Sequence, residues 1–418
     1  MNTSKSEQLW KKGQKLEING TSLFSRGPRI SVDGFAPKYC DRADGCYFWD
    51  VDGNKFLDYG MAVGSIILGH GFINDAIKNQ LSKGTNLTLL SPLEVELAEE
   101  IRKNIPSCQR LKFLSSGTEA TEAAIRIARA YTERDIVIHD HYHGWSDWCV
   151  PSKSGVPKDC SSLSIKEDTE DIERYRALFD MHSGNIACII VEPVKSEDVT
   201  YAKRKKFLRE LKELCEDNHS LLIFDEVACG YRFGVGGAQS FFKVTPDIST
   251  FGKAIANGLP FSFVGCSEEI GNEVEDKVFI SSTFGGNVLS LAACRATTSI
   301  MKASKVEKYL AYYGEKLKSE INKISEENFL QNSLQIVGFP QRIAWKQTNW
   351  DLVSLMFQEF IRNDIFFAWE IKNSYSHVEG ELNQTIETFS EVVKICKKAK
   401  EENKILEHLE GKPMRPIL

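Results

Sequence analysis

The chain has 418 residues, 42% of them hydrophobic and 10% aromatic, which is ordinary for a soluble protein with two or three layers or domains around a large core. Its net charge of −6 argues against a dedicated nucleic-acid surface. Eleven cysteines without a Cys-x-x-Cys pair favour reduced thiols, and neither a secretory signal nor an apolar stretch of about 18 residues occurs, so we expect a cytoplasmic protein that does not enter a membrane.

Residues 1–60 are expected to form an N-terminal segment that is punctuated by glycine and proline. Near its end, apolar residues alternate on both sides of Asp52-Gly53-Asn54. This pattern predicts two short strands joined by a tight turn within residues 47–58.

Residues 61–300 form the predicted large domain, because short apolar runs alternate there with helical patterns. Such alternation is typical of an α/β fold, in which a mostly parallel sheet carries helices on both faces. Apolar residues at helical spacing after Gly117 predict a helix that begins at the edge of this sheet. The predicted strands are residues 111–114, 136–138, 186–191, 221–224 and 261–266.

Residues 301–418 are expected to form a smaller α+β domain at the C-terminus. Long charged helical patterns begin after residue 300, and a two-strand pattern follows at residues 334–345 before further helices.

Ser116-Gly117-Thr118 lies at the turn between a predicted strand and a predicted helix. The backbone N–H groups of a glycine turn, together with the positive end of a helix dipole, bind phosphate well. The alternative is a capped helix without a ligand, since these residue types also suit a first turn. Thr283 stands in a second turn of small residues and offers a hydroxyl to a phosphate oxygen, although alone it is an ordinary helix start.

Asp225 ends the apolar run 221–224 and is expected at the carboxyl end of a central strand, where open α/β sheets bind ligands. A buried carboxylate needs a cationic partner to stay ionised. The protonated ring nitrogen of a pyridine cofactor would be such a partner, and the alternatives are Arg232 or a cap of the following loop.

Lys253 lies in an apolar, glycine-rich stretch, residues 249–260. Poor solvation and a nearby cation lower the pKa of a lysine and make its amine a nucleophile. An ordinary surface lysine is the alternative.

Tyr142 and His143 follow the predicted strand 136–138. Tyr142 can stack on a pyridine ring, and His143 can orient the ring or the loop. His139 and His141 nearby raise the question of a metal site, but no ligand spacing completes a tetrahedral set, so no metal is expected. A phosphate turn, an aromatic ring, a buried carboxylate and a lysine are the groups that hold pyridoxal 5′-phosphate, which is the predicted cofactor.

The order of these motifs resembles the class III pyridoxal-phosphate-dependent aminotransferases of fold type I, and most closely the branch that contains glutamate-1-semialdehyde 2,1-aminomutase. The resemblance covers most of the chain. The matching stretches are Trp49 to Asn54, Leu68-Gly69-His70, Ser116 to Thr121, Tyr142-His143-Gly144, Val191 to Val194, Asp225-Glu226-Val227, Gly230-Tyr231-Arg232, Gly252-Lys253 and Thr283 to Asn287.

The resemblance implies a role for each matched residue at the cofactor. These roles are covalent attachment for Lys253, the ring nitrogen for Asp225, the phosphate for Gly117 and Thr118, and ring stacking for Tyr142. Ser116 and His143 complete the set of residues that are expected to bind the cofactor. Thr283 is expected to reach the phosphate of the neighbouring subunit's cofactor, which implies a homodimer with shared active sites.

The resemblance also implies candidate substrate residues. Arg26 or Arg29 matches the substrate-facing arginine and would bind an acceptor carboxylate or phosphate. Glu370 matches a carboxylate near the cofactor.

Two departures from the aminomutase pattern shape the functional hypothesis. Residues 61–64 read Met-Ala-Val-Gly instead of carrying a Ser-Trp pair, and residues 145–162 are shorter than the gating loop of that branch. A mutase must retain its intermediate behind a closed lid, so these changes favour simple amino transfer from a small-molecule amino donor to a small aldehyde or ketone. The acceptor suggested by analogy is a modified sugar or a phosphorylated carbonyl.

The alternative function is intramolecular amino transfer, as in glutamate-1-semialdehyde 2,1-aminomutase. A catalytically silent scaffold on this fold would lack the lysine or the aspartate, and both are present. Sugar dehydratases on the same fold replace the lysine with histidine, so that activity is disfavoured.

Overall fold

A computed structural model describes residues 1–152, 154–196, 199–346 and 348–415. The chain divides into two compact units. The first contains residues 1–72, residue 196 and the described residues from 308 onward, so both terminal segments belong to it; the second contains residues 73–195 and 199–307.

The second unit is built on a seven-stranded sheet with the order β4-β10-β9-β8-β7-β5-β6. The pairs from β9 to β6 are parallel, and β10 runs antiparallel to both of its neighbours. The predicted α/β fold with a mostly parallel sheet is therefore confirmed. The strands are β4 (Arg110–Leu114), β5 (Ile136–His139), β6 (Ser164–Lys166), β7 (Ile186–Val191), β8 (Leu221–Glu226), β9 (Ile248–Phe251) and β10 (Ser262–Cys266).

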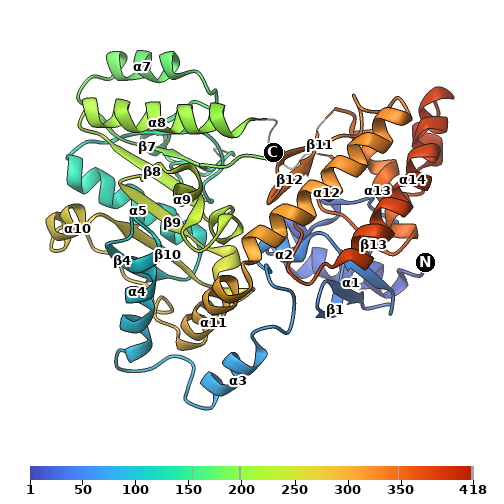
Figure 1. Ribbon diagram of the computed structural model, residues 1–418, viewed down its shortest axis with the longest axis horizontal. Coiled ribbons are helices and arrows are strands. Elements are labelled where there is room, and N and C mark those ends of the chain that lie inside the picture. Colours follow the sequence, from blue (N-terminus) through green and yellow to red (C-terminus); the bar gives the residue numbers. More distant parts are fainter. Residues whose placement is uncertain (153, 197–198, 347, 416–418) are drawn as a thin grey trace. The chain divides into compact units, whose positions relative to one another are not determined.

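Every residue of β7 and β8 is buried, as expected for central parallel strands that are covered on both faces. Helix α5 packs across β7, β8, β9 and β10, while α8 contacts β7 and β8 and has α7 beside it (Figure 1). The helices of this unit are α3 (Asn74–Leu81), α4 (Pro92–Asn104), α5 (Gly117–Thr132), α6 (Lys158–Ser162), α7 (Ile172–Met181), α8 (Tyr201–Asp217), α9 (Gly237–Phe242), α10 (Glu268–Val274) and α11 (Val288–Ser304).

The first unit contains two small sheets, with the orders β1-β2-β3-β13 and β11-β12-β14. The predicted hairpin is confirmed, and Asp50 closes its turn because Oδ1 accepts hydrogen bonds from the N–H groups of Asp52 (3.0 Å) and Asn54 (2.7 Å). The predicted strand pair at residues 334–345 is confirmed as β11 and β12. The strands are β1 (Cys40–Asp44), β2 (Tyr47–Asp50), β3 (Lys55–Asp58), β11 (Ile336–Phe339), β12 (Arg342–Trp345), β13 (Ile365–Phe366) and β14 (Glu370–Ile371).

The helices of the first unit include two long C-terminal ones, as the charged helical patterns predict. They are α1 (Ser4–Leu16), α2 (Met61–Gly64), α12 (Val306–Glu327), whose first residues belong to the second unit, α13 (Trp350–Arg362) and α14 (Glu379–Glu401). Apolar residues of α12, α13 and α14 join those of β3, β11 and β12 in one hydrophobic core.

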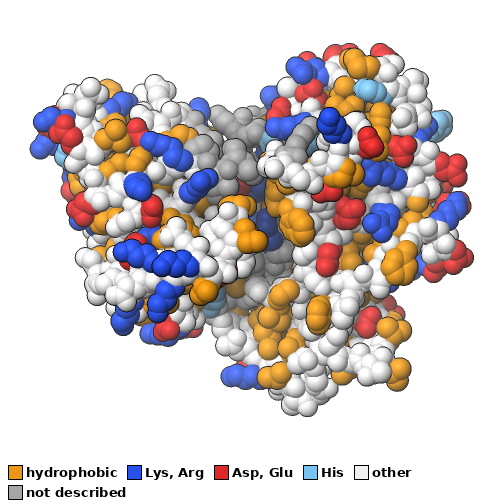
Figure 2. Space-filling model, turned by 180° about the vertical axis from the view of Figure 1, so that it is seen from behind, with side chains coloured by type: hydrophobic (Ala, Val, Ile, Leu, Met, Phe, Trp, Pro, Cys, Tyr) orange, Lys and Arg blue, Asp and Glu red, His pale blue; other side chains and the backbone are white. Residues whose placement is uncertain are grey.

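All eleven cysteines are free thiols, and nine of them are buried. Acidic and basic side chains are interspersed over the face of the molecule that Figure 2 shows. Among the described residues, no helix is long and apolar enough to span a membrane.

Candidate active site

One edge of the seven-stranded sheet gathers most of the predicted site residues. Strands β5, β7, β8 and β9 are parallel, and β4 has the same direction because the antiparallel β10 lies between it and β9. The segments that follow these strands therefore meet at the carboxyl edge, where ligands bind in open α/β sheets.

Asp225 and Lys253 follow neighbouring strands at this edge. Asp225 is in register with Thr250 on the adjacent strand β9, and Lys253 comes three residues after Thr250. The carboxylate of Asp225 is buried, and its Oδ1 accepts hydrogen bonds from the N–H of Val227 (3.0 Å) and the hydroxyl of Thr250 (3.2 Å). The sheet thus holds the carboxylate in a fixed orientation beside the strand that leads to the lysine.

Lys253 has left-handed backbone geometry, with φ of +47°. A non-glycine residue in this region is strained by about 1–3 kcal/mol, so the surrounding fold must hold it there. Its side chain is exposed, whereas Ala254, Ile255 and Ala256 are buried. The apolar stretch predicted from the sequence therefore anchors the backbone and leaves the amine accessible.

The predicted phosphate turn is the N-terminus of α5. Ser116 is the N-cap, and its side chain accepts a hydrogen bond from the N–H of Glu119 (3.2 Å). The hydroxyl of Ser262 on β10 donates to the carbonyl of Ser116 (2.7 Å), which ties the turn to the sheet. The capped helix is therefore present, with its first turn at the carboxyl edge.

The loop that carries Tyr142 and His143 lies against this helix start. Thr121 of α5 donates its hydroxyl to the carbonyl of His143 (2.6 Å). Gly144 has φ of +116°, and a Cβ there would lie 2.7 Å from Oγ1 of Thr118. The close approach requires glycine. Tyr142, two residues before Gly144, is half exposed.

His143 is buried between two carboxylates. Its Nδ1 lies 2.7 Å from Oδ2 of Asp225, and its Nε2 lies 2.9 Å from Oδ1 of Asp140. Burial disfavours the imidazolium, but the hydrogen bonds to Asp140 and Asp225 outweigh it and raise the pKa of His143 to about 10. Sequence reasoning gave His143 a supporting position but assigned no role to Asp140, whose only signal was its place in the His-rich string.

Val227 is a second residue without a role in the sequence prediction. A Cβ at Gly117 would lie 2.7 Å from its Cγ1, and a Cβ at Gly252 would lie 3.2 Å from the same atom. Val227 thus joins three of the predicted motifs at one point. The available signal was its spacing, two residues after Asp225.

The predicted substrate residues belong to the first unit. Arg26 and Glu370 line a cavity of about 620 Å³, together with Ala62 and Val63 of the turn that departs from the aminomutase pattern. Arg29 does not line this cavity.

Glu370 is held by three partners. Its Oε1 accepts hydrogen bonds from Arg342 (3.0 Å) and the hydroxyl of Ser196 (2.7 Å), and its Oε2 pairs with Lys372. Burial opposes ionisation, but the charges of Arg342 and Lys372 outweigh burial and keep the pKa of Glu370 well below its usual range.

Thr283 is exposed and lies just before α11, whose N-cap is Asn287. It lines a groove of about 790 Å³ in the second unit that also includes the strongly exposed side chains of Leu89 and Leu90.

Comparisons with known proteins find relatives over most of the chain. Residues 34–338 match the family described as Aminotransferase class-III. The chain is 32% identical to a 3-aminobutyryl-CoA aminotransferase from Cloacimonas acidaminovorans, over 94% of this chain and 98% of the relative. It is also 32% identical to a glutamate-1-semialdehyde 2,1-aminomutase from Sulfurisphaera tokodaii, over 93% and 99% of the two chains.

Solved structures share the fold at lower identity. The FumI protein of Sphingopyxis sp. MTA144 aligns with a TM-score of 0.89 at 22% identity, covering 98% of this chain and 99% of its own. A glutamate-1-semialdehyde aminomutase from Pseudomonas aeruginosa PAO1 aligns with a TM-score of 0.83 at 17% identity, covering 94% and 95%. The chain belongs to the class III aminotransferase family, whose enzymes use pyridoxal phosphate.

Proposed function

We propose that this protein is an aminotransferase that moves an amino group from a small-molecule donor to a small aldehyde or ketone. The observation that carries the proposal is the convergence of four segments at one sheet edge, with Asp225 in register with the strand that leads to Lys253. When bound, pyridoxal phosphate takes up the amino group of the donor and passes it to the acceptor.

The residues at the edge fit this cofactor. The turn at Ser116, Gly117 and Thr118 offers backbone N–H groups at a helix N-terminus for the phosphate. Asp225 presents a buried carboxylate for the ring nitrogen, and the methyl groups of Val227 supply an apolar surface beside Gly117.

The other residues have roles that follow from their positions. The exposed amine of Lys253 would hold the cofactor through its aldehyde, and the same amine would be the group available to move a proton during amino transfer. The half-exposed ring of Tyr142 would stack on the cofactor, and His143, which is hydrogen-bonded to Asp225, would orient its carboxylate.

Replacement of Lys253 tests the proposal directly. In Lys253→Ala we expect loss of the visible absorbance of bound cofactor and a fall in amino transfer of at least about a thousandfold. The matched control is Lys243→Ala, because Lys243 is also exposed with left-handed φ (+56°). Retention of both absorbance and turnover in Lys253→Ala would refute the assignment.

Intramolecular amino transfer is the second candidate, because several relatives at 32–39% identity are named glutamate-1-semialdehyde 2,1-aminomutase. Against it, Ala62 and Val63 present only small apolar side chains to the cavity of the first unit. Incubation of purified protein with glutamate-1-semialdehyde, without a second substrate, separates the two functions. We expect little aminolevulinate to form. Rapid formation of aminolevulinate would make intramolecular amino transfer the favoured function.

A screen of amino donors and carbonyl acceptors identifies the substrates. Conversion of the bound cofactor can be followed by absorbance for each amino donor, and each carbonyl acceptor can then be tested for recovery. Arg26 lines the cavity of the first unit, and its guanidinium group can pair with an anion. We therefore expect acceptors that carry a carboxylate or a phosphate to react fastest.

A further inference from the structure

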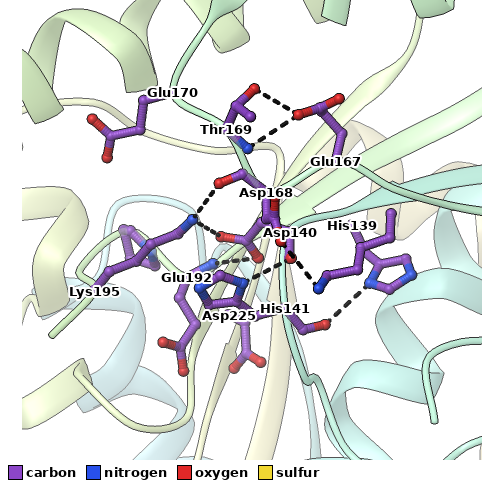
Figure 3. A network of polar contacts seen from close by, with 12 residues as sticks. His139, Asp140, His141, Glu167, Asp168, Thr169, Glu170, Glu192, Lys195 and Asp225 are labelled. Carbon is purple, nitrogen blue, oxygen red and sulfur yellow. Dashed lines mark hydrogen bonds and ion pairs between the residues drawn. The ribbon is translucent and has the colours of Figure 1, made fainter. Parts of the chain in front are cut away.

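A buried chain of alternating charges begins at Asp225. His143 bridges Asp225 and Asp140, and the ammonium group of Lys195 lies 3.4 Å from Oδ2 of Asp140. The side chains of these four residues are at most 5% exposed. Lys195 also donates to the carbonyl of Asp168 (3.3 Å), which fixes its direction (Figure 3).

The topology explains why these groups meet. Asp140 follows β5, Lys195 follows β7 and Asp225 is the last but one residue of β8, and these three strands are consecutive in the sheet. Their carboxyl ends therefore lie side by side. The N–H of Glu192, just after β7, also approaches Oδ1 of Asp140 (3.4 Å).

The two carboxylate partners of His143 favour its doubly protonated state. An ionised carboxylate only accepts hydrogen bonds, so a ring whose two nitrogens both face ionised carboxylates carries a proton on each. The charges then read Lys195 positive, Asp140 negative, His143 positive and Asp225 negative, which sum to zero. A balanced set is what burial of four charged groups requires.

We propose that Asp140 and Lys195 are positioning residues for Asp225: Asp140 holds His143 with both ring N–H groups engaged, and Lys195 balances the charge of Asp140. The imidazolium then fixes the Asp225 carboxylate as an oriented anion at the place where the proposed function puts the ring nitrogen of the cofactor. This role rests on that proposed function, whereas the charge state of His143 does not.

The ionisation of Asp140 and the rings around His143 are consistent with this arrangement. Burial opposes ionisation of Asp140, but its contacts with His143 and Lys195 outweigh burial and keep its pKa well below the usual range. The ring of His143 stacks on Trp148 with centroids 6.0 Å apart, and the ring of His139 lies edge-on at 6.2 Å. These aromatic neighbours exclude water without competing for the ring nitrogens.

The experiment measures the protonation of His143 by NMR in the full-length protein without cofactor, labelled with ¹⁵N-histidine and assigned with a His143→Gln variant. In the wild type we expect both ring nitrogens to be protonated at pH 7–8. In Asp140→Asn we expect the pKa of His143 to fall by at least one unit, which is a tenfold loss of proton affinity. In Lys195→Met the pKa of His143 should not fall, because a positive neighbour has been removed.

This difference in sign separates positioning from simple loss of packing, which would lower the pKa of His143 in both variants. The matched controls come from the solvent-exposed pair Lys394 and Glu391, whose side chains lie 2.6 Å apart. Glu391→Gln and Lys394→Met should leave the His143 signals unchanged. If Asp140→Asn does not fold, the double variant Asp140→Asn/Lys195→Met removes both charges together and should show the lowered pKa.

The cofactor-loaded enzyme provides the second readout. In Asp140→Asn we expect kcat to fall about tenfold with little change in the KM for the donor, because Asp225 acts on the cofactor ring and not on donor binding. A singly protonated His143 in the wild type at pH 7, or identical His143 signals in the wild type and Asp140→Asn, would overturn the proposal. Such a result would leave the function tested by Lys253→Ala intact, whereas failure of the Lys253 test would leave the NMR result intact.

Discussion

At the residue scale, the site could be predicted as far as its motifs are local in sequence. Lys253, Asp225 and Gly117 each stand in a short pattern whose chemistry is readable without a structure. Asp140 and Lys195 are different, because 55 residues separate them and their contact exists only through the adjacency of β5 and β7. Single-sequence patterns do not report such pairs.

Asp225 gives the most direct prediction at this scale. Asp225→Asn preserves the size and can still accept from Val227 and Thr250, but it removes the negative charge offered to the cofactor ring. We expect kcat to fall by about a hundredfold or more while the cofactor stays bound through Lys253. Steady-state kinetics with absorbance spectroscopy checks this, and an unchanged kcat would contradict the role.

At the element scale, the strands with apolar runs were predictable, whereas the short polar strand β9 was not. The runs that became β7 and β8 are almost uniformly aliphatic, and their burial follows from composition. Strand β9 (Ile248–Phe251) has serine and threonine at its centre and no clear periodicity, so its place in the sheet depends on neighbours. Its hydroxyl groups find partners there, as Thr250 does on Asp225.

The turn after β3 gives a prediction at the element scale. Oδ1 of Asp58 accepts hydrogen bonds from the N–H groups of Gly60 (2.7 Å) and Met61 (3.1 Å), at a turn where Met61, Ala62 and Val63 all have positive φ. Burial raises the pKa of Asp58 to about 6, although these hydrogen bonds oppose the rise.

The sign of the pH dependence follows from this raised value. Between the ordinary pKa and pH 6 the folded state binds more protons than the unfolded state, so the contribution of Asp58 to stability falls as pH rises through that window. Asp58→Asn keeps a side-chain oxygen that accepts these hydrogen bonds, but the amide does not titrate in this range. The variant therefore shows no such loss of stability as the pH rises. From pH 5 to 7.5 the free energy of unfolding of Asp58→Asn, relative to the wild type, should therefore rise by about 1.5 kcal/mol in denaturant titrations. A constant difference would show that Asp58 is already ionised at pH 5.

At the scale of the whole molecule, we propose a homodimer in which Thr283 serves the cofactor of the neighbouring subunit. Thr283 is exposed in a groove with Leu89 and Leu90, and apolar side chains this exposed are typical of a protein interface. A mixed dimer tests this proposal, because each site would take Lys253 from one chain and Thr283 from the other.

Thr283→Ala should weaken cofactor binding about tenfold, through loss of one hydrogen bond to a charged group. When it is co-expressed with the inactive Lys253→Ala chain, half of the sites in each mixed dimer regain both wild-type residues. We expect these sites to bind cofactor with wild-type affinity and to be active, as measured on dimers purified through two different tags. Mixed dimers without such sites would show that Thr283 serves its own subunit or none.

The parallel pairing of β13 with β3 has a consequence for biosynthesis. It joins Ile365 to Leu57, so the ribosome must add about three hundred residues after the first partner before the second exists. The second unit is almost uninterrupted between residues 73 and 307 and is complete much earlier. We therefore expect the second unit to fold first during translation. The amino-terminal segment can complete its sheet only after the last quarter of the chain has been synthesised.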